Sequence, residues 1–119
     1  MADGPFRMIV RQGIKPGKLD EFKKMAEGLT AGAEADEPTT LAYEWFIDAD
    51  GSSCYLIESY GNAEAFLLHF QGLGSKLEAL LEISPLDEMV VLGDPSPEVI
   101  EMLAGLGAKF YSLHVGFAR

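Results

Sequence analysis

The chain has 119 residues, of which 48% are hydrophobic, and it carries a formal net charge of −10 at pH 7. This length and composition are typical of one globular domain with a single core and argue against a disordered chain. The acidic balance excludes a surface that neutralises a row of phosphates, so neither nucleic acid nor an anionic membrane is an expected partner.

Cysteine and histidine usage narrows the kinds of site that the chain can hold. The one cysteine, Cys54, excludes an intrachain disulfide and a multi-cysteine metal site. The two histidines, His69 and His114, lie far apart in the sequence and match no metal-ligand spacing, so we expect no metal. The first residues lack the basic region and apolar run of a signal peptide, and no window resembles a membrane helix. We therefore expect a cytoplasmic protein.

The first third of the chain predicts a strand, a helix and a connector. Residues 5–14 alternate between two faces, as a strand does, and Lys-Pro-Gly then ends the strand. Apolar side chains next recur at helical spacing: Leu19, Phe22, Ala26 and Leu29. Gly28 and Gly32 are expected to weaken the end of this helix, and residues 33–38 are interpreted as an acidic connector.

Residues 39–70 predict a β-hairpin followed at once by a helix. The strands, 41–47 and 54–60, are rich in β-branched and aromatic residues, and Gly51 suits the tight turn between them. Asn62 is the expected N-cap of the helix. Neither face of the hairpin is cleanly polar, so both faces of the sheet are expected to be covered. Helices can cover one face, but a chain of this length has little left to cover the other.

The rest of the chain supplies a second half of similar design. The helix after Asn62 is expected to bend or divide at Gly72 and Gly74. The elements that follow are a helical piece over 75–83, a strand over 86–93, a short helix capped by Ser96 and a final strand over 108–119.

This order of elements predicts an α+β fold. The series β-α-β-β-α-β is the ferredoxin-like arrangement, in which two helices lie on one side of a four-stranded antiparallel sheet. We expect one domain over residues 1–119, with its core in about 5–93 and an extension of a helix and a strand over 94–119. A homodimer that packs sheet against sheet would supply the missing second layer.

The segment YEWFIDADGSSCYLIESYGNAEAFLLHF resembles the centre of the antibiotic biosynthesis monooxygenase family. The shared features are an aromatic-rich strand, an Asp-Gly turn, a strand that ends in Glu-x-Tyr and a helix that opens with x-x-Ala-x-x-x-His. The resemblance covers about residues 5–93 and implies a dimeric α/β barrel whose C-terminal strand reaches the partner subunit. It also implies oxidation of a small aromatic or quinol-like substrate by molecular oxygen, with no metal, flavin or other cofactor.

Two candidate catalytic residues and several aromatic residues follow from this resemblance. His69 matches the family's helix histidine, and histidine is the side chain that exchanges protons near neutral pH. Alternatively, His69 could only form hydrogen bonds with neighbouring backbone groups near the end of the helix. Tyr60 is the second catalytic candidate, and Tyr43 and Trp45 are candidates for the wall of an aromatic cavity. Aromatic residues on a two-faced sheet can equally be plain core.

The remaining candidates are charged residues and two rings of the helix after the hairpin. Glu58 lies inside an apolar strand, where a buried charge is costly unless it is paired. Arg11 and Arg7 are the expected partners, in a structural ion pair or at a polar spot in a pocket. Phe66 and Phe70 complete the candidate substrate-binding residues, and His114 is expected at an interface or in a partner's cavity.

Two functions from different classes remain open. One is the cofactor-independent monooxygenase, and the other is a non-catalytic dimer that binds a small ligand or another protein. An oxygenase requires a pocket of roughly 300 Å³ or more with convergent polar groups. A structural dimer could fill that space with aromatic rings: Trp45, Phe46, Phe66 and Phe70.

Overall fold

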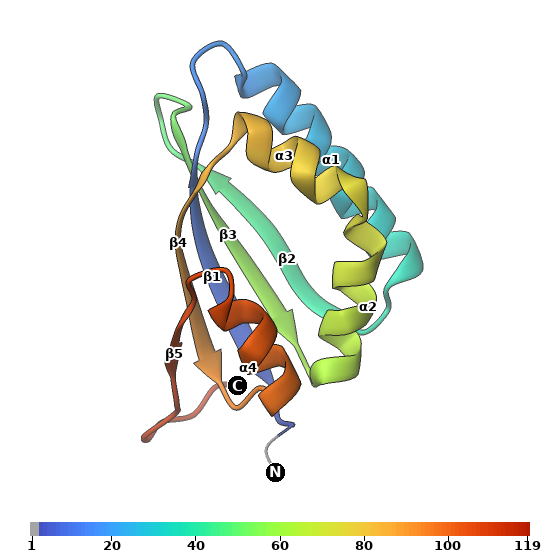
Figure 1. Cartoon of the computed structure of the whole chain (residues 1–119), viewed down its shortest axis with the longest axis vertical. Coiled ribbons are helices and arrows are strands. Elements are labelled where there is room, and N and C mark those ends of the chain that lie inside the picture. The colour runs from blue at the N-terminus through green and yellow to red at the C-terminus, as the bar shows by residue number, and fades with distance from the viewer. Residues whose placement is uncertain (1–2) are drawn as a thin grey trace.

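The computed structural model describes residues 3–119 and shows a five-stranded sheet with four helices (Figure 1). In chain order the elements are β1 (Phe6–Gly13), α1 (Leu19–Asp36), β2 (Thr40–Ile47), β3 (Ser53–Tyr60), α2 (Ala63–Leu73), α3 (Ser75–Ile83), β4 (Leu86–Gly93), α4 (Pro97–Ala104) and β5 (Lys109–Tyr111). The strand order is β2-β3-β1-β4-β5, with β5 parallel to β4 and every other pair antiparallel. The predicted ferredoxin-like α+β fold is confirmed.

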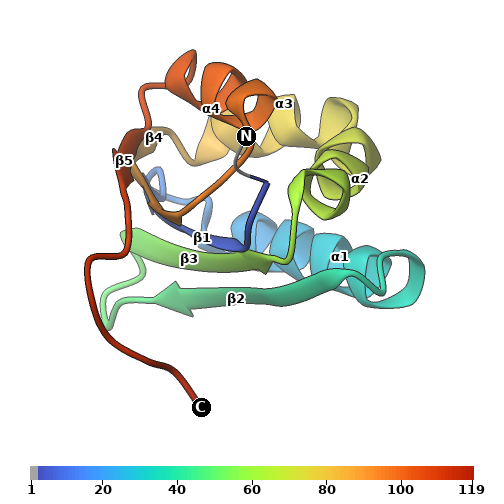
Figure 2. The same cartoon turned by 90° about the horizontal axis from the view of Figure 1, so that it is seen from below.

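The helices gather on one face of the sheet. Figure 2 shows α2, α3 and α4 together over that face, while the segment after β5 extends to the opposite side. Alternate residues of the central strands β1 and β3 are buried beneath the helices. These buried strand residues include Phe6, Val10, Leu56 and Tyr60. The opposite face carries exposed apolar side chains, among them Phe46 and Tyr55. The sheet therefore has one covered and one uncovered apolar face, as the pattern of the hairpin predicts.

Local capping signals place the helix ends as predicted. The Asn62 side chain accepts a hydrogen bond from the Ala65 N–H at 3.0 Å, and the Ser96 hydroxyl accepts one from the Val99 N–H at 3.3 Å. The helical segment after the hairpin divides at Gly74, whose φ of +52° breaks α2 from α3. Among residues 3–119, no helix is both long and apolar enough to cross a membrane.

Two predicted boundaries are wrong. Helix α1 continues through Gly28 and Gly32 to Asp36, because Leu29 and Ala33 are buried on its inner side, whereas both glycines are exposed. Packing of an apolar side thus outweighs the low helix propensity of glycine. The final strand is also shorter than predicted, since only Lys109–Tyr111 pairs with β4. The segment after it is exposed, including Val115 and Phe117, and has no sheet neighbour within the described chain.

Candidate functional site

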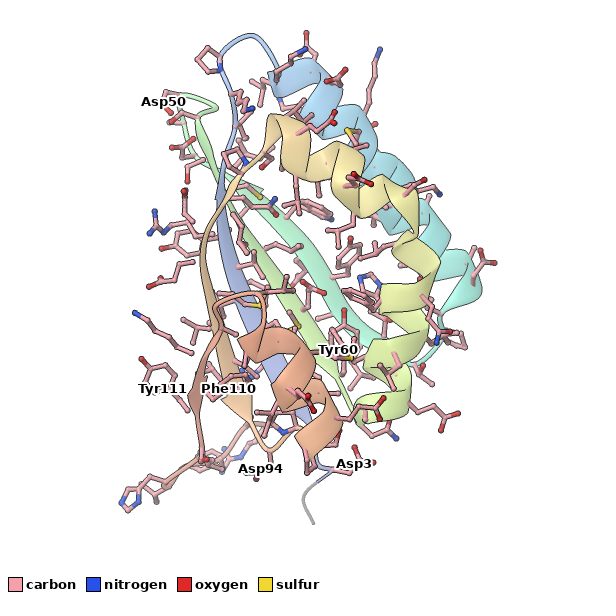
Figure 3. The ribbon with its side chains drawn as sticks, viewed as in Figure 1. Asp3, Asp50, Tyr60, Asp94, Phe110 and Tyr111 are labelled. Carbon is pink, nitrogen blue, oxygen red and sulfur yellow. The ribbon has the colours of Figure 1, made fainter. Side chains whose placement is uncertain are left out.

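A cluster of proton-exchanging side chains is buried between the sheet and α2. The His69 ring lies between two carboxylates, with its Nδ1 2.6 Å from Glu37 Oε1 and its Nε2 3.6 Å from Glu58 Oε1. The Tyr60 hydroxyl donates a hydrogen bond to the same Glu58 oxygen at 2.5 Å. Figure 3 shows Tyr60 directed into the space between β3 and α2. The cluster combines three separate parts of the chain: the end of α1, β3 and α2.

Helix α2 carries His69 on its inner side. Ala65, Phe66 and His69 recur at helical spacing and are the buried residues of this helix. His69 is only 2% exposed, so the interpretation that it merely binds backbone near a helix end does not describe its surroundings. The contact with Glu37 assigns the ring N–H to Nδ1, because a carboxylate accepts hydrogen bonds. In this tautomer of the neutral ring, the lone pair lies on Nε2, which can act as a base.

Glu37 is a functional candidate that the sequence analysis missed. It follows α1 directly, where its N–H donates to the Ala33 carbonyl at 2.9 Å, and its carboxylate also accepts a hydrogen bond from the Thr40 hydroxyl. A Cβ placed on Gly72 of α2 would lie 3.1 Å from Glu37 Oε2, so a glycine at this position leaves room for the carboxylate. Glu37 therefore acts as the group that orients His69.

Glu58 and Tyr60 occupy alternate positions of β3 and so point to the same face. Burial raises the pKa of the Glu58 carboxyl above its ordinary value, although the Tyr60 hydroxyl and His69 oppose the rise. Burial together with the neighbouring Glu58 raises the pKa of the Tyr60 hydroxyl. Burial thus favours the neutral form of Glu58, in which the carboxyl can donate a proton.

The Tyr43 ring packs against the ring of His69. Its ring centroid lies 4.7 Å from that of His69, in an edge-to-face arrangement. Burial raises the pKa of the Tyr43 hydroxyl, and the negative charges of Glu58 and Glu37, when these groups are ionised, raise it further. Tyr43 is therefore a neutral phenol that can donate a hydrogen bond beside the base.

The cluster opens onto an apolar cavity of about 100 Å³ between the sheet and helices α2, α3 and α4. His69, Glu58, Tyr43 and Gln12 supply the polar groups of its wall. Gln12 is held in place, because its side-chain amide donates to the Ser84 hydroxyl and carbonyl. The cavity is smaller than the roughly 300 Å³ expected for an oxygenase, yet the histidine lines it and does not face solvent.

Most of the residues predicted for the site converge on this cavity. Those that line it are His69, Glu58, Tyr43, Trp45, Phe66 and Phe70. Tyr60 does not line the cavity, but its hydroxyl donates a hydrogen bond to Glu58, which does. The Trp45 Nε1–H already donates to the Thr30 hydroxyl at 3.0 Å, so Trp45 offers a ring surface to a ligand.

The structure does not bring Arg11 into the site. Because Gln12 is one of the inward-facing residues of β1, Arg11 points to the outer face, where it lies opposite Tyr55 and 3.7 Å from Asp87. The expected pairing of Glu58 with Arg11 or Arg7 is therefore wrong, and Tyr60 and His69 take that place. Phe46 is 54% exposed on the outer face, so it does not fill the interior either.

Comparison with known proteins places the chain in a family. A profile described as antibiotic biosynthesis monooxygenase matches residues 5–76, which is more than half of the chain. The chain belongs to the antibiotic biosynthesis monooxygenase family. The matched range contains α1, the hairpin and α2, and so includes all four residues of the buried cluster. A comparison with curated proteins finds no match.

Solved structures show the same fold at low sequence identity. MupZ from Pseudomonas fluorescens is 18% identical, with a TM-score of 0.85 over 98% of this chain and 96% of MupZ. An antibiotic biosynthesis monooxygenase-like protein from Caulobacter crescentus is 21% identical, with a TM-score of 0.64 over 75% of this chain and 86% of that protein. SnoaB from Streptomyces nogalater, a cofactor-independent oxygenase, is 18% identical, with a TM-score of 0.63 over 74% of this chain and 90% of SnoaB. The match to MupZ extends over nearly the whole chain, so α4 and β5 lie within a shared fold.

Proposed function

We propose that this protein is a cofactor-independent monooxygenase that acts on a small aromatic, quinol-like substrate with an ionisable phenol or enol group. The observation that carries the proposal is the His69 ring, held by Glu37 at one nitrogen and facing an apolar cavity beside Glu58. Family membership and the likeness to a cofactor-independent oxygenase support the same reaction class.

The reaction begins with proton transfer. His69 Nε2 takes the phenol or enol proton, and the resulting anion passes one electron to molecular oxygen. The substrate radical and superoxide then combine, which forms a carbon–oxygen bond and a peroxide anion. Glu58 gives its proton to the distal peroxide oxygen. Loss of water breaks the oxygen–oxygen bond as the proton on the same carbon leaves, so a CH₂ group and O₂ become a carbonyl group and H₂O.

In these reaction steps the protein orients the substrate, excludes water and transfers protons. An apolar wall excludes water, which strengthens the electrostatic interactions of the few polar groups that remain. Tyr43 stands beside His69 as a neutral donor that can stabilise the developing phenolate. Glu37 holds Nδ1, so Nε2, which lies 3.6 Å from Glu58 Oε1, is the nitrogen left to meet the substrate.

Oxygen uptake by metal-free protein tests the proposal. A panel of hydroquinones and anthrone-like phenols should include a substrate, and His69→Ala is expected to lower its rate by about 10²–10⁴-fold. Leu68→Ala is the matched control, since Leu68 lies on the same helix, is 44% exposed and does not line the cavity. If both variants oxidise the substrate at the wild-type rate, His69 is not the base.

The buried carboxyl of Glu58, 3.6 Å from His69 Nε2, favours a second candidate function, which is redox-neutral acid–base catalysis. A base at His69 and an acid at Glu58 can move a proton from one substrate atom to another, as an isomerase does, without oxygen. The two candidates separate under nitrogen. Product that still forms, with deuterium incorporated from heavy water, supports proton transfer, whereas a strict requirement for oxygen supports the monooxygenase.

We also propose that the protein is a homodimer, closed through the outer face of the sheet. Leu41 and Phe46 of β2 are 67% and 54% exposed on or beside this face. Leu113, Val115 and Phe117 after β5 are between 73% and 80% exposed, and they suit contacts with a partner subunit. An obligate interface of this type would bury about 2,000 Å² or more. His114 would then lie at the interface.

A further inference from the structure

We propose that the substrate of this cavity carries an extended, uncharged aliphatic chain, which lies along a leucine-rich passage and leaves the protein between α3 and α4. The placement of the reactive head group at His69 rests on the proposed function. The placement of the chain rests on the cavity itself.

The wall of the cavity has two parts of different chemistry. Aromatic rings gather at the histidine: Tyr43 lies 5.3 Å from Trp45, and Phe66 lies 5.8 Å from Phe70, measured between ring centroids. The other helical residues of the wall are leucines: Leu29, Leu73, Leu77, Leu80, Leu81, Leu103 and Leu106. All of these except Leu29 and Leu73 belong to α3, α4 or the residues just after α4, and not to the helix that carries His69. A planar head group suits the first part and a flexible chain suits the second.

The size of the cavity also favours a chain over a fused-ring molecule. Its volume is about 100 Å³, somewhat less than the roughly 150 Å³ of an engineered apolar cavity that binds benzene in another protein. A single ring therefore already requires small side-chain movements, and a fused-ring molecule requires larger ones. A rigid system of several rings would have to push the sheet and helices apart. A chain fills a narrow passage one methylene at a time, and leucine side chains can change rotamer to admit it.

Two half-exposed leucines mark the opening. Leu81 of α3 is 36% exposed and Leu106, just after α4, is 44% exposed, although both line the cavity. Leu103 of α4 is buried beside them, so the short helix of the C-terminal extension forms one side of the opening. No lysine or arginine lines the cavity among the described residues, so nothing there would bind a carboxylate or phosphate on the chain.

The protein contains its own reporter of occupancy. Trp45 is the single tryptophan and lies in the cavity wall, so its fluorescence changes when a ligand enters. We would titrate the protein with phenol and with 4-alkylphenols of increasing chain length. Affinity is expected to rise by up to roughly fourfold per buried methylene and then to level off once the chain reaches the opening. Anthrone and 2-naphthol serve as fused-ring competitors.

Charged substitutions at the opening test the path of the chain. Leu106→Asp and Leu81→Asp change partly exposed positions, and each is expected to remove the dependence on chain length while phenol itself still binds. Ile100→Asp, on the exposed side of α4, is the matched control and is expected to keep the wild-type dependence. Circular dichroism confirms that each variant is folded.

The proposal is overturned if affinity does not depend on chain length, or if a fused-ring ligand binds more tightly than an alkylphenol of equal carbon number. It is also overturned if Leu81→Asp and Leu106→Asp behave like Ile100→Asp. These are equilibrium binding measurements, so they stand whether or not oxygen is consumed. Absence of oxygen uptake would refute the proposed monooxygenase and leave the chain-binding result intact.

Discussion

Replacing Glu58 by glutamine is expected to stabilise the folded protein at neutral pH, by an amount that grows with pH. Burial raises the pKa of the Glu58 carboxyl above its ordinary value of 4.5. The folded protein therefore holds this proton more tightly than the unfolded chain does. The stability contributed by the protonated carboxyl is fully present below pH 4.5 and is lost as pH rises through the folded-state pKa.

The size of this effect has a clear upper limit. One titrating group changes the free energy of unfolding by at most about 1.4 kcal/mol per pH unit. Between the ordinary glutamate value of 4.5 and pH 7, the wild type therefore loses at most about 3.5 kcal/mol relative to the variant. Glutamine keeps a carbonyl oxygen that accepts the Tyr60 hydrogen bond, so the substitution removes the titration without removing the acceptor.

Urea unfolding between pH 4 and pH 8 measures the effect. His69, Glu37, Tyr43 and Tyr60 also surround Glu58, but they are present in both proteins, so the difference between wild type and Glu58→Gln isolates the one carboxyl. This difference should be small near pH 4 and should increasingly favour the variant at higher pH. Glu44→Gln, on the exposed side of β2, should show no such trend. A difference that is constant with pH, or that favours the wild type at pH 7, would refute the reasoning.

Three further changes test other contacts of the structure. Tyr60→Phe removes a fully buried hydroxyl that donates to a carboxyl, so the free energy of unfolding in urea should fall by about 1–3 kcal/mol, and an unchanged value would contradict the hydrogen bond. Gly72→Ala should leave the melting temperature unchanged, because the gain in helix propensity of about 1 kcal/mol offsets the close contact of the new methyl group with Glu37. The same contact displaces the Glu37 carboxylate, so the rate of oxygen uptake should fall. Gly28→Ala is the control, because its added methyl group has open space around it and oxygen uptake should not change. If Gly72→Ala is as active as Gly28→Ala, the new methyl group does not displace Glu37. Deletion of residues 112–119 should convert a dimer into a monomer, slightly lighter than the 12.9 kDa full chain, in sedimentation equilibrium, and an intact dimer would exclude this segment from the interface.

The parts of the fold that the sequence predicts well are those with local physical signals. Asn62 and Ser96 each accept a hydrogen bond from the N–H three residues later, a contact that depends on neighbouring residues alone. Gly51 adopts a φ of +74° in the predicted turn. The end of α1 could not be predicted in this way, because burial of its apolar side against distant strands decides whether the helix continues past two glycines.

The candidate site was predictable only in part, for a similar reason. His69 and Glu58 stand out by chemistry, since one exchanges protons readily and the other is a carboxyl in an apolar strand. Glu37 does not stand out, because its partner lies 32 positions further along the chain and the hairpin separates them. Arg11 was assigned by charge alone. Strand register decides otherwise, since Met8, not Arg11, lies opposite Glu58 in the β1–β3 pair.

Glu37 follows a part of α1 that contains Gly28 and Gly32, and this has a consequence for motion. Each glycine inside a helix lowers its local stability by roughly 0.5–1 kcal/mol relative to alanine. The last turns of α1 therefore open at a lower free energy than the whole domain, and each opening separates Glu37 from His69. A ligand that binds only the assembled cluster holds these turns closed, so amide hydrogens at the end of α1 exchange more slowly when the cavity is occupied. Occupation of the cavity and order at a helix end are thus thermodynamically linked.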